Sequence, residues 1–273
     1  MKKAMLFFAV VLFLMVSVNN QTASGQNATV KEAVTQARFN GDYMSLAVLY
    51  YQRAAETRAL YYQGFNMAKM MIDKDLKVKS KLKRAIVLDI DETALDNSPY
   101  EAQCILGGFS YPVMWDEWCN AAKAEPTPGA VEFLKYAEKK GYAIFYITNR
   151  KAKFSEVTLK NLNDKGFPMA DTAHVVFRTK DNSKEARRLE VMKTYNIVLL
   201  LGDNLADFTT VYDEKLTMEQ RAQKTDSLKQ EFGKRFIMFP NPMYGEWEML
   251  VYPDPAASEA VKDSLRKASL IGF

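Results

Sequence analysis

Two patterns of apolar residues alternate along the chain from about residue 84 onward. Short runs rich in β-branched and aromatic residues have the length and composition of buried strands, and between them apolar residues recur every three to four positions, as in helices. The runs predicted as strands are 84–91, 142–147, 174–178, 197–201 and 235–239. Because this alternation is typical of parallel strands joined by crossover helices, we predict an α/β fold with a doubly wound parallel sheet.

One crossover helix is predicted between each successive pair of strands. The first has recognisable ends, because Thr127 stands at the position of an N-cap, Pro128 in the first turn and Gly141 where a helix would stop. The three later helices are predicted over residues 153–165, 184–195 and 214–232.

Residues 29–77 precede this alternation and also have a helical pattern without proline. Asn40-Gly41-Asp42 is predicted to break the segment into two helices. The apolar positions that recur at helical spacing, and that we expect to pack against the main domain, are Leu46, Leu49, Tyr50, Leu60, Phe65, Met67 and Met70.

Residues 96–127 fit neither pattern and are predicted to be an insertion that lies over the end of the first strand. The segment contains Gly107-Gly108 and an aromatic cluster of Tyr111, Trp115 and Trp118. These aromatic side chains either cover a substrate, as a cap would, or form the small core of a surface subdomain; the sequence leaves both open.

The first 25 residues have the composition of a secretory signal peptide. Lys2 and Lys3 precede an apolar run over residues 4–18, and Ala23-Ser24-Gly25 supplies the small residues of a cleavage site. A retained membrane anchor is the alternative, and the absence of a cysteine near the end of the run argues against lipid attachment. We therefore expect a periplasmic or secreted protein with a signal peptide (1–25), a helical segment (26–80) and a core (81–273).

Composition excludes some classes of function. The formal net charge of +4 is mild and spread along the chain, which does not fit binding to a nucleic acid polymer. Cys104 and Cys119 could pair in an oxidising compartment or stay separate thiols. His174 is the single histidine and lies in an apolar run, so we expect a core residue there, and a zinc site is hard to build.

Polar side chains follow several predicted strands and also open one helix. Asp89 and Asp91 end the first strand, Thr148 and Asn149 follow the second, Lys184 opens a helix, and Asp203 and Asp207 follow the strand 197–201. Because parallel strands bring their carboxyl ends to one edge of the sheet, we expect these groups to converge there.

This set of groups suits phosphoryl transfer. Carboxylates hold a magnesium ion, which offsets their repulsion of a phosphate dianion, while an amine and a hydroxyl stabilise the transferring group. Of two neighbouring aspartates, one can attack phosphorus and the other can carry the proton. A calcium loop starting at Asp89 is disfavoured, because Ala94 replaces its glycine and Tyr100 its final acid.

Four short motifs, together with flanking segments, resemble one known family. Asp89-Ile90-Asp91-Glu92-Thr93, Thr148-Asn149-Arg150, Lys184 and the segment 202–207 are similar to the motifs of the haloacid dehalogenase (HAD) superfamily, and more narrowly to its class C acid phosphatases, which include lipoprotein 5′-nucleotidases. The likeness extends to residues 55–68, 95–100, 184–188 and 241–247. It implies a HAD-like core with N-terminal helices and a small cap insertion.

The resemblance also implies roles for the acidic residues. Asp89 would be the nucleophile and Asp91 the acid/base. Mg²⁺ would be held by the side chain of Asp89, the backbone carbonyl of Asp91 and Asp203, with Asp207 nearby through water or Lys184.

The remaining implied roles concern the substrate. Thr148 and Asn149 would bind the phosphate and Lys184 would stabilise it, while Tyr244 and an aromatic of the insertion such as Trp118 would stack on the leaving group. We therefore expect a secreted Mg²⁺-dependent acid phosphatase acting on small phosphate esters, with nucleoside 5′-monophosphates foremost. A phosphatase for sugar phosphates and a non-catalytic storage or binding relative are the alternatives, and a homodimer is left open.

Overall fold

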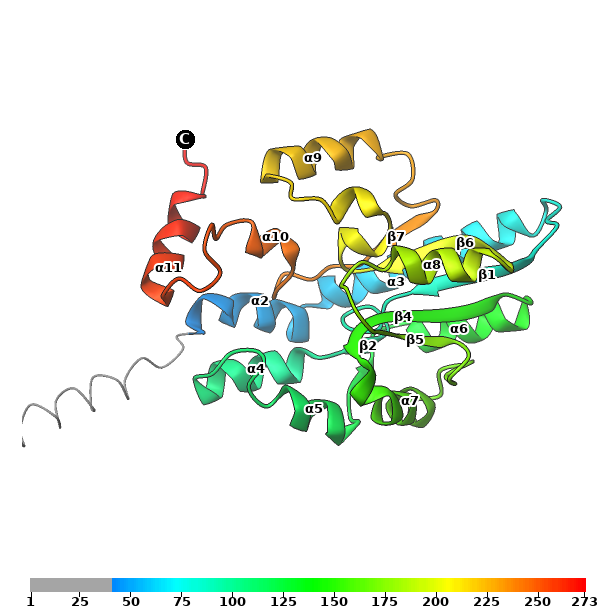
Figure 1. Cartoon of the computed structure of the whole chain (residues 1–273), viewed down its shortest axis with the longest axis horizontal. Coiled ribbons are helices and arrows are strands. Elements are labelled where there is room, and N and C mark those ends of the chain that lie inside the picture. Colours follow the sequence, from blue (N-terminus) through cyan, green and yellow to red (C-terminus); the bar gives the residue numbers. More distant parts are fainter. Residues whose placement is uncertain (1–40) are drawn as a thin grey trace, which may run out of the picture. The chain divides into compact units, whose positions relative to one another are not determined.

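The computed structural model describes residues 41–273 (Figure 1), so the predicted signal peptide lies outside the described residues. Five parallel strands form one sheet in the order β5-β4-β1-β6-β7. Their bounds are β1 Lys83–Leu88, β4 Ala143–Lys151, β5 Val175–Arg178, β6 Tyr195–Gly202 and β7 Phe236–Met238. The prediction of a doubly wound parallel α/β fold is therefore confirmed. No helix between residues 41 and 273 has the length and apolar character needed to cross a membrane.

Both faces of the sheet are covered, as the alternation of side chains in a strand requires. Ile86 and Leu88 of β1 point into one core, and Ala85 and Val87 point into another on the opposite face. Helices α3 (Ala55–Asp75), α6 (Ala130–Lys139) and α7 (Ser155–Asp164) contribute to the first core, and α8 (Glu185–Met192) contributes to the second.

The buried face of the N-terminal helices differs from the prediction. Helix α2 (Asp42–Arg53) buries Met44, Val48 and Tyr51, whereas Leu46 is 78% exposed. Leu49, Tyr50, Leu60 and Met70 are exposed as well. Apolar residues lie on more than one side of these helices, so their spacing could not identify the packed side. The predicted break at 40–42 begins outside the described residues, and within them a break lies at Ala54, whose backbone is extended.

Helix α3 connects the N-terminal helices to the centre of the sheet. The ring of Tyr61 stacks on Phe239 with centroids 5.0 Å apart, and Phe65 packs on the same ring at 4.6 Å. Gly64 permits this approach, because a methyl group there would lie 2.5 Å from the Phe239 ring. The Tyr61 hydroxyl donates to the backbone carbonyl of Glu92, so α3 also supports the loop after β1.

Residues 95–126 form a separate element between β1 and α6. Strands β2 (Leu95–Asp96) and β3 (Glu125–Pro126) pair antiparallel and close its two ends, and helices α4 (Ser98–Gly107) and α5 (Trp115–Ala121) lie between them. We call residues 95–126 the insertion. Its two cysteines are buried free thiols, so the structure has no disulfide between them.

Several element ends differ from the sequence prediction. Strand β1 ends at Leu88 and not at residue 91, and β4 continues through Lys151. Thr127 does not cap α6: its hydroxyl donates to the carbonyl of Thr93, and Gly129 (φ 87°) precedes the helix instead. Helix α9 (Met218–Ser227) is shorter than predicted, since Thr217 and Gln220 form a capping box at its start.

The other elements are short. Helices α10 (Glu246–Met249) and α11 (Glu259–Ala268) follow β7, and short 3₁₀ helices span Ala152–Phe154, Leu205–Asp207 and Thr210–Tyr212.

The expectation that His174 is a core residue is wrong. It precedes β5, its side chain is 23% exposed, and it pairs with Asp171.

Glu101 of the insertion gives the fold a predictable pH dependence. Burial, aided by the nearby carboxyl of Glu248, raises the pKa of Glu101 from 4.5 to about 7. The folded protein therefore binds a proton that the unfolded chain releases between these values, and stability falls as the pH rises. Gln has no carboxyl group to ionise, so the variant avoids the free energy that wild type spends on ionising Glu101 in the folded state. The unfolding free energy of Glu101→Gln relative to wild type should therefore rise by roughly 3 kcal/mol from about pH 4 to about pH 8.

Urea unfolding at the two pH values measures this difference, and the same substitution at the exposed Glu117 of α5 is the control. A gain at Glu101 that does not change with pH would contradict the assignment.

Candidate active site

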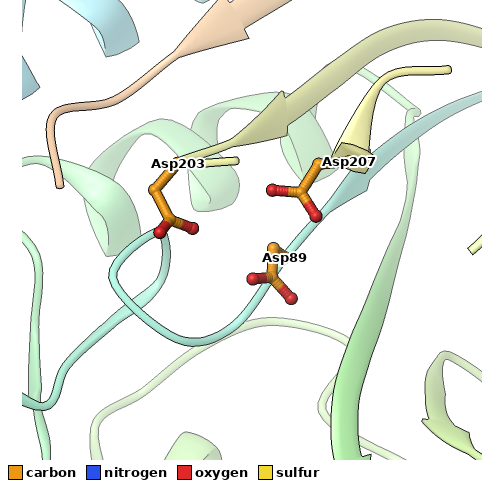
Figure 2. Close-up of side chains that lie close together, drawn as sticks. All are labelled: Asp89, Asp203 and Asp207. Atoms are coloured by element: carbon orange, nitrogen blue, oxygen red, sulfur yellow. The ribbon is translucent and has the colours of Figure 1, made fainter. Parts of the chain in front are cut away.

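Three carboxylates converge at the carboxyl edge of the sheet (Figure 2). Asp89 follows β1, Asp203 follows β6, and Asp207 ends the 3₁₀ turn after it. An oxygen of each lies within 4.8 Å of the others. Strands β1 and β6 are neighbours at the centre of the sheet, where the chain turns from building one half to building the other. This is the switch point where open α/β sheets bind ligands.

Gly202 explains how Asp207 comes so close to the strand. A methyl group at Gly202 would lie 2.7 Å from the carboxyl carbon of Asp207, closer than any side chain tolerates. The Asp207 carboxylate also accepts a hydrogen bond from the backbone N–H of Asn204 at 3.0 Å. The glycine and this turn therefore fix the third carboxylate against the end of β6.

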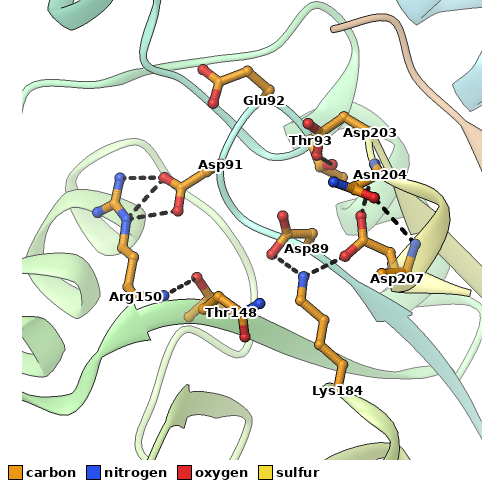
Figure 3. Close-up of polar contacts among 12 residues, drawn as sticks. Asp89, Asp91, Glu92, Thr93, Thr148, Arg150, Lys184, Asp203, Asn204 and Asp207 are labelled. Carbon is orange, nitrogen blue, oxygen red and sulfur yellow. Dashed lines mark hydrogen bonds and ion pairs between the residues drawn. The ribbon is translucent and has the colours of Figure 1, made fainter. Parts of the chain in front are cut away.

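Lys184 is the counter-charge of this cluster (Figure 3). Its ammonium lies 2.5 Å from Asp89 and 2.6 Å from Asp207, and the side chain is buried. Burial opposes its charge, but Asp207 and Asp89 outweigh burial and raise the pKa of Lys184 above its usual value. Burial raises the pKa of Asp89 to about 7 despite Lys184, with Asp207 and Asp91 adding to the rise.

The donor set fits a divalent cation. Three carboxylates, that of Asp207 buried and the other two partly buried, lie beside one ammonium, which leaves an excess of negative charge that hard, oxygen-coordinated cations neutralise. The pKa of Asp203 is raised well above its usual value by burial and by Asp207 and Asp89, the repulsion that a cation would relieve. Thr93 and Asn241 donate to the two Asp203 oxygens at 3.2 and 2.9 Å and so orient that carboxylate.

Asp91 is set apart from this cluster. Its carboxylate is turned toward Arg150, whose Nη2 lies 2.8 Å from Oδ1 (Figure 3). Asn97 Nδ2 donates to the same oxygen at 2.7 Å. The Asp91 side chain is therefore outside the group of three carboxylates. The predicted use of its backbone carbonyl as a metal ligand stays a prediction.

The two predicted phosphate-binding residues of β4 differ in environment. Thr148 is fully buried, and its hydroxyl oxygen accepts a hydrogen bond from the backbone N–H of Arg150 at 3.1 Å. The hydroxyl proton is then left for another acceptor. Asn149 is exposed, and its side-chain amide contacts the carbonyl of Asn182 at 2.9 Å and the Arg187 guanidinium at 2.7 Å. The Asn149 side chain thus ties β4 to the loop before Lys184.

Tyr244 and Trp118, predicted to stack on a substrate, are both partly buried. The Tyr244 hydroxyl donates to the Glu92 carboxyl, and Trp118 Nε1 donates to Asn97 Oδ1 at 2.8 Å. Burial, together with Asp91 and Asp203, raises the pKa of Glu92 well above its usual value. Both aromatic residues therefore bond to polar side chains of the segment that follows β1.

Sequence reasoning assigned no role to Asn97, Arg150 and Asn241, although it quoted the segments that contain them. A polar residue next to a catalytic motif gives a weak signal. Their importance depends on contacts such as Arg150–Asp91 and Asn241–Asp203, which join residues far apart in the chain.

Comparison with known proteins identifies the family. Residues 11–247 match the family model described as HAD superfamily, subfamily IIIB (acid phosphatase). The structure is similar to that of a class C acid phosphatase from Bacillus anthracis, with a TM-score of 0.82 and 44% identity over 85% of this chain and 98% of the other. The same enzyme has also been solved with tungstate bound, at the same similarity.

Curated relatives are more distant. Acid phosphatase 1 of Solanum lycopersicum is 26% identical over 58% of this chain and 57% of its own length, and vegetative storage protein 1 of Arabidopsis thaliana is 27% identical over 63% and 58%. The chain thus spans less than two thirds of these relatives. The resemblance inferred from the four motifs is confirmed: this chain belongs to subfamily IIIB of the HAD superfamily, a family of acid phosphatases, which are phosphoric monoester hydrolases.

Proposed function

We propose that this protein is a Mg²⁺-dependent phosphomonoesterase that works through a phosphorylated Asp89. The observation that carries the proposal is the convergence of Asp89, Asp203 and Asp207 at the switch point of the sheet, with the Lys184 ammonium between Asp89 and Asp207. Tungstate is a tetrahedral dianion like phosphate, so the tungstate complex of the Bacillus anthracis relative supports an oxyanion site in this family.

The chain's own groups can carry both halves of the reaction. Lys184 and the free proton of the Thr148 hydroxyl bind the phosphoryl oxygens, and Asn149 remains a further candidate. An Asp89 oxygen attacks phosphorus while the bond to the leaving oxygen breaks, and Asp91 gives that oxygen a proton. Water then attacks the aspartyl phosphate, Asp91 takes its proton, and phosphate and free Asp89 result.

Asp89, Asp203 and Asp207, with the Asp91 carbonyl, would hold the cation. A bound Mg²⁺ supplies charge neutralisation, so that a carboxylate can approach a phosphate dianion.

Nucleoside 5′-monophosphates are the proposed substrates. Tyr244 and Trp118 present partly buried rings near the catalytic loop, and aromatic rings stack on any base. A Bacillus cereus protein described as a candidate nucleotidase is 42% identical over 74 residues, or 26% of this chain. Sugar phosphates are the second candidate class. The Arabidopsis storage protein suggests a non-catalytic alternative, which the presence of Asp89 and Asp91 disfavours.

The proposed location is periplasmic or secreted, because residues 1–25 have the composition of a signal peptide.

The nucleophile assignment is tested with Asp89→Asn. This nearly isosteric change should lower kcat for an aromatic phosphate ester by at least about 10³-fold, because the amide cannot form the phosphoryl intermediate. Rapid acid quenching of wild type with labelled ester should trap the phosphoryl group on Asp89. Substantial activity in a correctly folded Asp89→Asn protein would reject the assignment.

The metal assignment is tested by chelation and at Gly202. Excess EDTA should abolish activity and added Mg²⁺ should restore it. Gly202→Ala should displace Asp207 and weaken the rise in Tm that Mg²⁺ gives, shifting its midpoint about 10- to 100-fold, as loss of a supporting metal contact does. Gly107→Ala is the matched control, because its methyl group would crowd the Phe109 ring in the insertion, and it should leave that midpoint unchanged. Full activity in EDTA would sink the metal claim.

The substrate class is tested with Tyr244→Ala on two sets of esters. Loss of a stacking ring worth about 1–3 kcal/mol should lower kcat/KM for nucleoside monophosphates by roughly 5- to 150-fold and leave sugar phosphates nearly unchanged. Wild type should also prefer the nucleotides. A preference for sugar phosphates, or an equal loss on both sets, would favour the second candidate class.

A further inference from the structure

Asn97, a buried residue at the start of the insertion, uses every hydrogen-bonding group of its side chain. Its Nδ2 donates to Asp91 Oδ1 at 2.7 Å and to Glu92 Oε2 at 3.3 Å. Its Oδ1 accepts from Trp118 Nε1 at 2.8 Å and from Arg150 Nη2 at 3.2 Å. An amide has two donor hydrogens and two acceptor lone pairs, so this side chain is fully satisfied.

Trp118 fixes which way the Asn97 amide faces. An indole N–H can only donate, and so can a guanidinium, so the amide atom that meets Trp118 and Arg150 must be the oxygen. The NH₂ group is then forced toward Asp91 and Glu92. A tryptophan of helix α5 thereby determines that Asp91 receives a hydrogen-bond donor from this side.

The contacts to Asp91 are unequal on its two oxygens. Oδ1 lies 2.7 Å from Asn97 Nδ2, 2.9 Å from Arg150 Nε and 2.8 Å from Arg150 Nη2. Among residues 41–273, Oδ2 has only the longer contact of 3.3 Å to Arg150 Nε. One oxygen is therefore held by donors, which leaves the other as the oxygen that can carry a proton.

Arg150 is itself held from several sides. Its side chain is only 2% exposed, Nη1 donates to Thr158 Oγ1 at 3.2 Å, and its guanidinium lies 5.7 Å from the ring centre of Trp115. Thr158 belongs to α7 and Trp115 to the insertion. The Arg150 guanidinium, which forms the ion pair with Asp91, thus connects the core of the fold with the insertion.

We propose that Asn97 and Arg150 are positioning residues that bind Asp91 Oδ1 and present Oδ2 for proton transfer to the leaving oxygen, and that Trp118 sets this arrangement from the insertion. The inference rests on the proposed function, since it concerns the acid step of the same reaction. In that step the Asp89–phosphorus bond forms, the bond from phosphorus to the leaving oxygen breaks, and the Oδ2 proton moves to that oxygen.

The test compares kcat/KM for a simple alkyl phosphate and for p-nitrophenyl phosphate, because kcat/KM reports the steps up to departure of the alcohol. An alkoxide leaves poorly without a proton, whereas p-nitrophenolate leaves well without one. Asn97→Asp keeps the acceptor for Trp118 and Arg150 and removes the donor to Asp91. It should lower kcat/KM about 10- to 100-fold for the alkyl ester and less than about 5-fold for the aryl ester.

Asn161→Asp is the matched control. Asn161 is equally buried and bonds through its amide to the backbone of Ala124 at 2.9 and 3.1 Å, without contact to Asp91. The Asn161→Asp variant should have a lower Tm than wild type but the same ratio of kcat/KM for the alkyl and aryl esters. Trp118→Phe provides a second measurement, since it removes one donor and keeps a ring, and it should lower the alkyl rate more than the aryl rate.

Equal losses on both esters in Asn97→Asp, or a larger loss on the aryl ester in Trp118→Phe, would overturn the inference. The second result would assign Trp118 to stacking alone. If Asn97→Asp does not fold, Trp118→Phe decides. A wild-type protein inactive on both esters would refute the proposed function itself, whereas an active wild type with an unchanged ratio in folded Asn97→Asp refutes only the positioning roles.

Discussion

The repulsion among three closely spaced carboxylates is the constraint on which the rest of the site depends. Asp89, Asp203 and Asp207 lie together at the edge of the sheet, and burial together with the neighbouring carboxylates raises the pKa values of Asp89 and Asp203. The fold provides one fixed cation, Lys184, between two of them. It also provides oriented donors for the third, from Thr93 and Asn241. The negative charge that remains is the charge that the proposed divalent cation would neutralise.

The two aspartates of the first motif are separated by the same fold. Asp89 belongs to the carboxylate cluster, while Asp91 is turned to Arg150 (Figure 3). Asp91 also accepts a hydrogen bond from Asn97. Strand β1 ends at Leu88, so the chain is free to turn after it, and Glu92 takes a positive φ of 56° there. Two identical side chains two residues apart therefore have different neighbours, which is the condition for different chemical roles.

The insertion and the N-terminal helices meet this loop from two sides. Tyr61 of α3 reaches the Glu92 carbonyl, and Trp118 of α5 reaches Asn97. Tyr244 reaches the Glu92 carboxyl from the segment after β7. The N-terminal helices, expected to pack, and the aromatic residues expected to meet a substrate thus also support the loop that carries Asp89 and Asp91. Loops held in this way keep a site rigid enough for proton and phosphoryl transfer.

The sequence by itself determined the class of fold and the family. Strand and helix periods are local properties, and motifs such as Asp89-Ile90-Asp91 combine several residues in a fixed order, so both can be recognised without coordinates. Tertiary structure decided which side of α2 is buried, what Thr127 bonds to, and which groups hold Asp91. The reason is physical: Arg150 and Asn97 lie 59 and 6 positions from Asp91, and the Asn97–Trp118 bond spans 21 positions. Such partners are chosen by the packing of separate elements, which spacing along the chain does not encode.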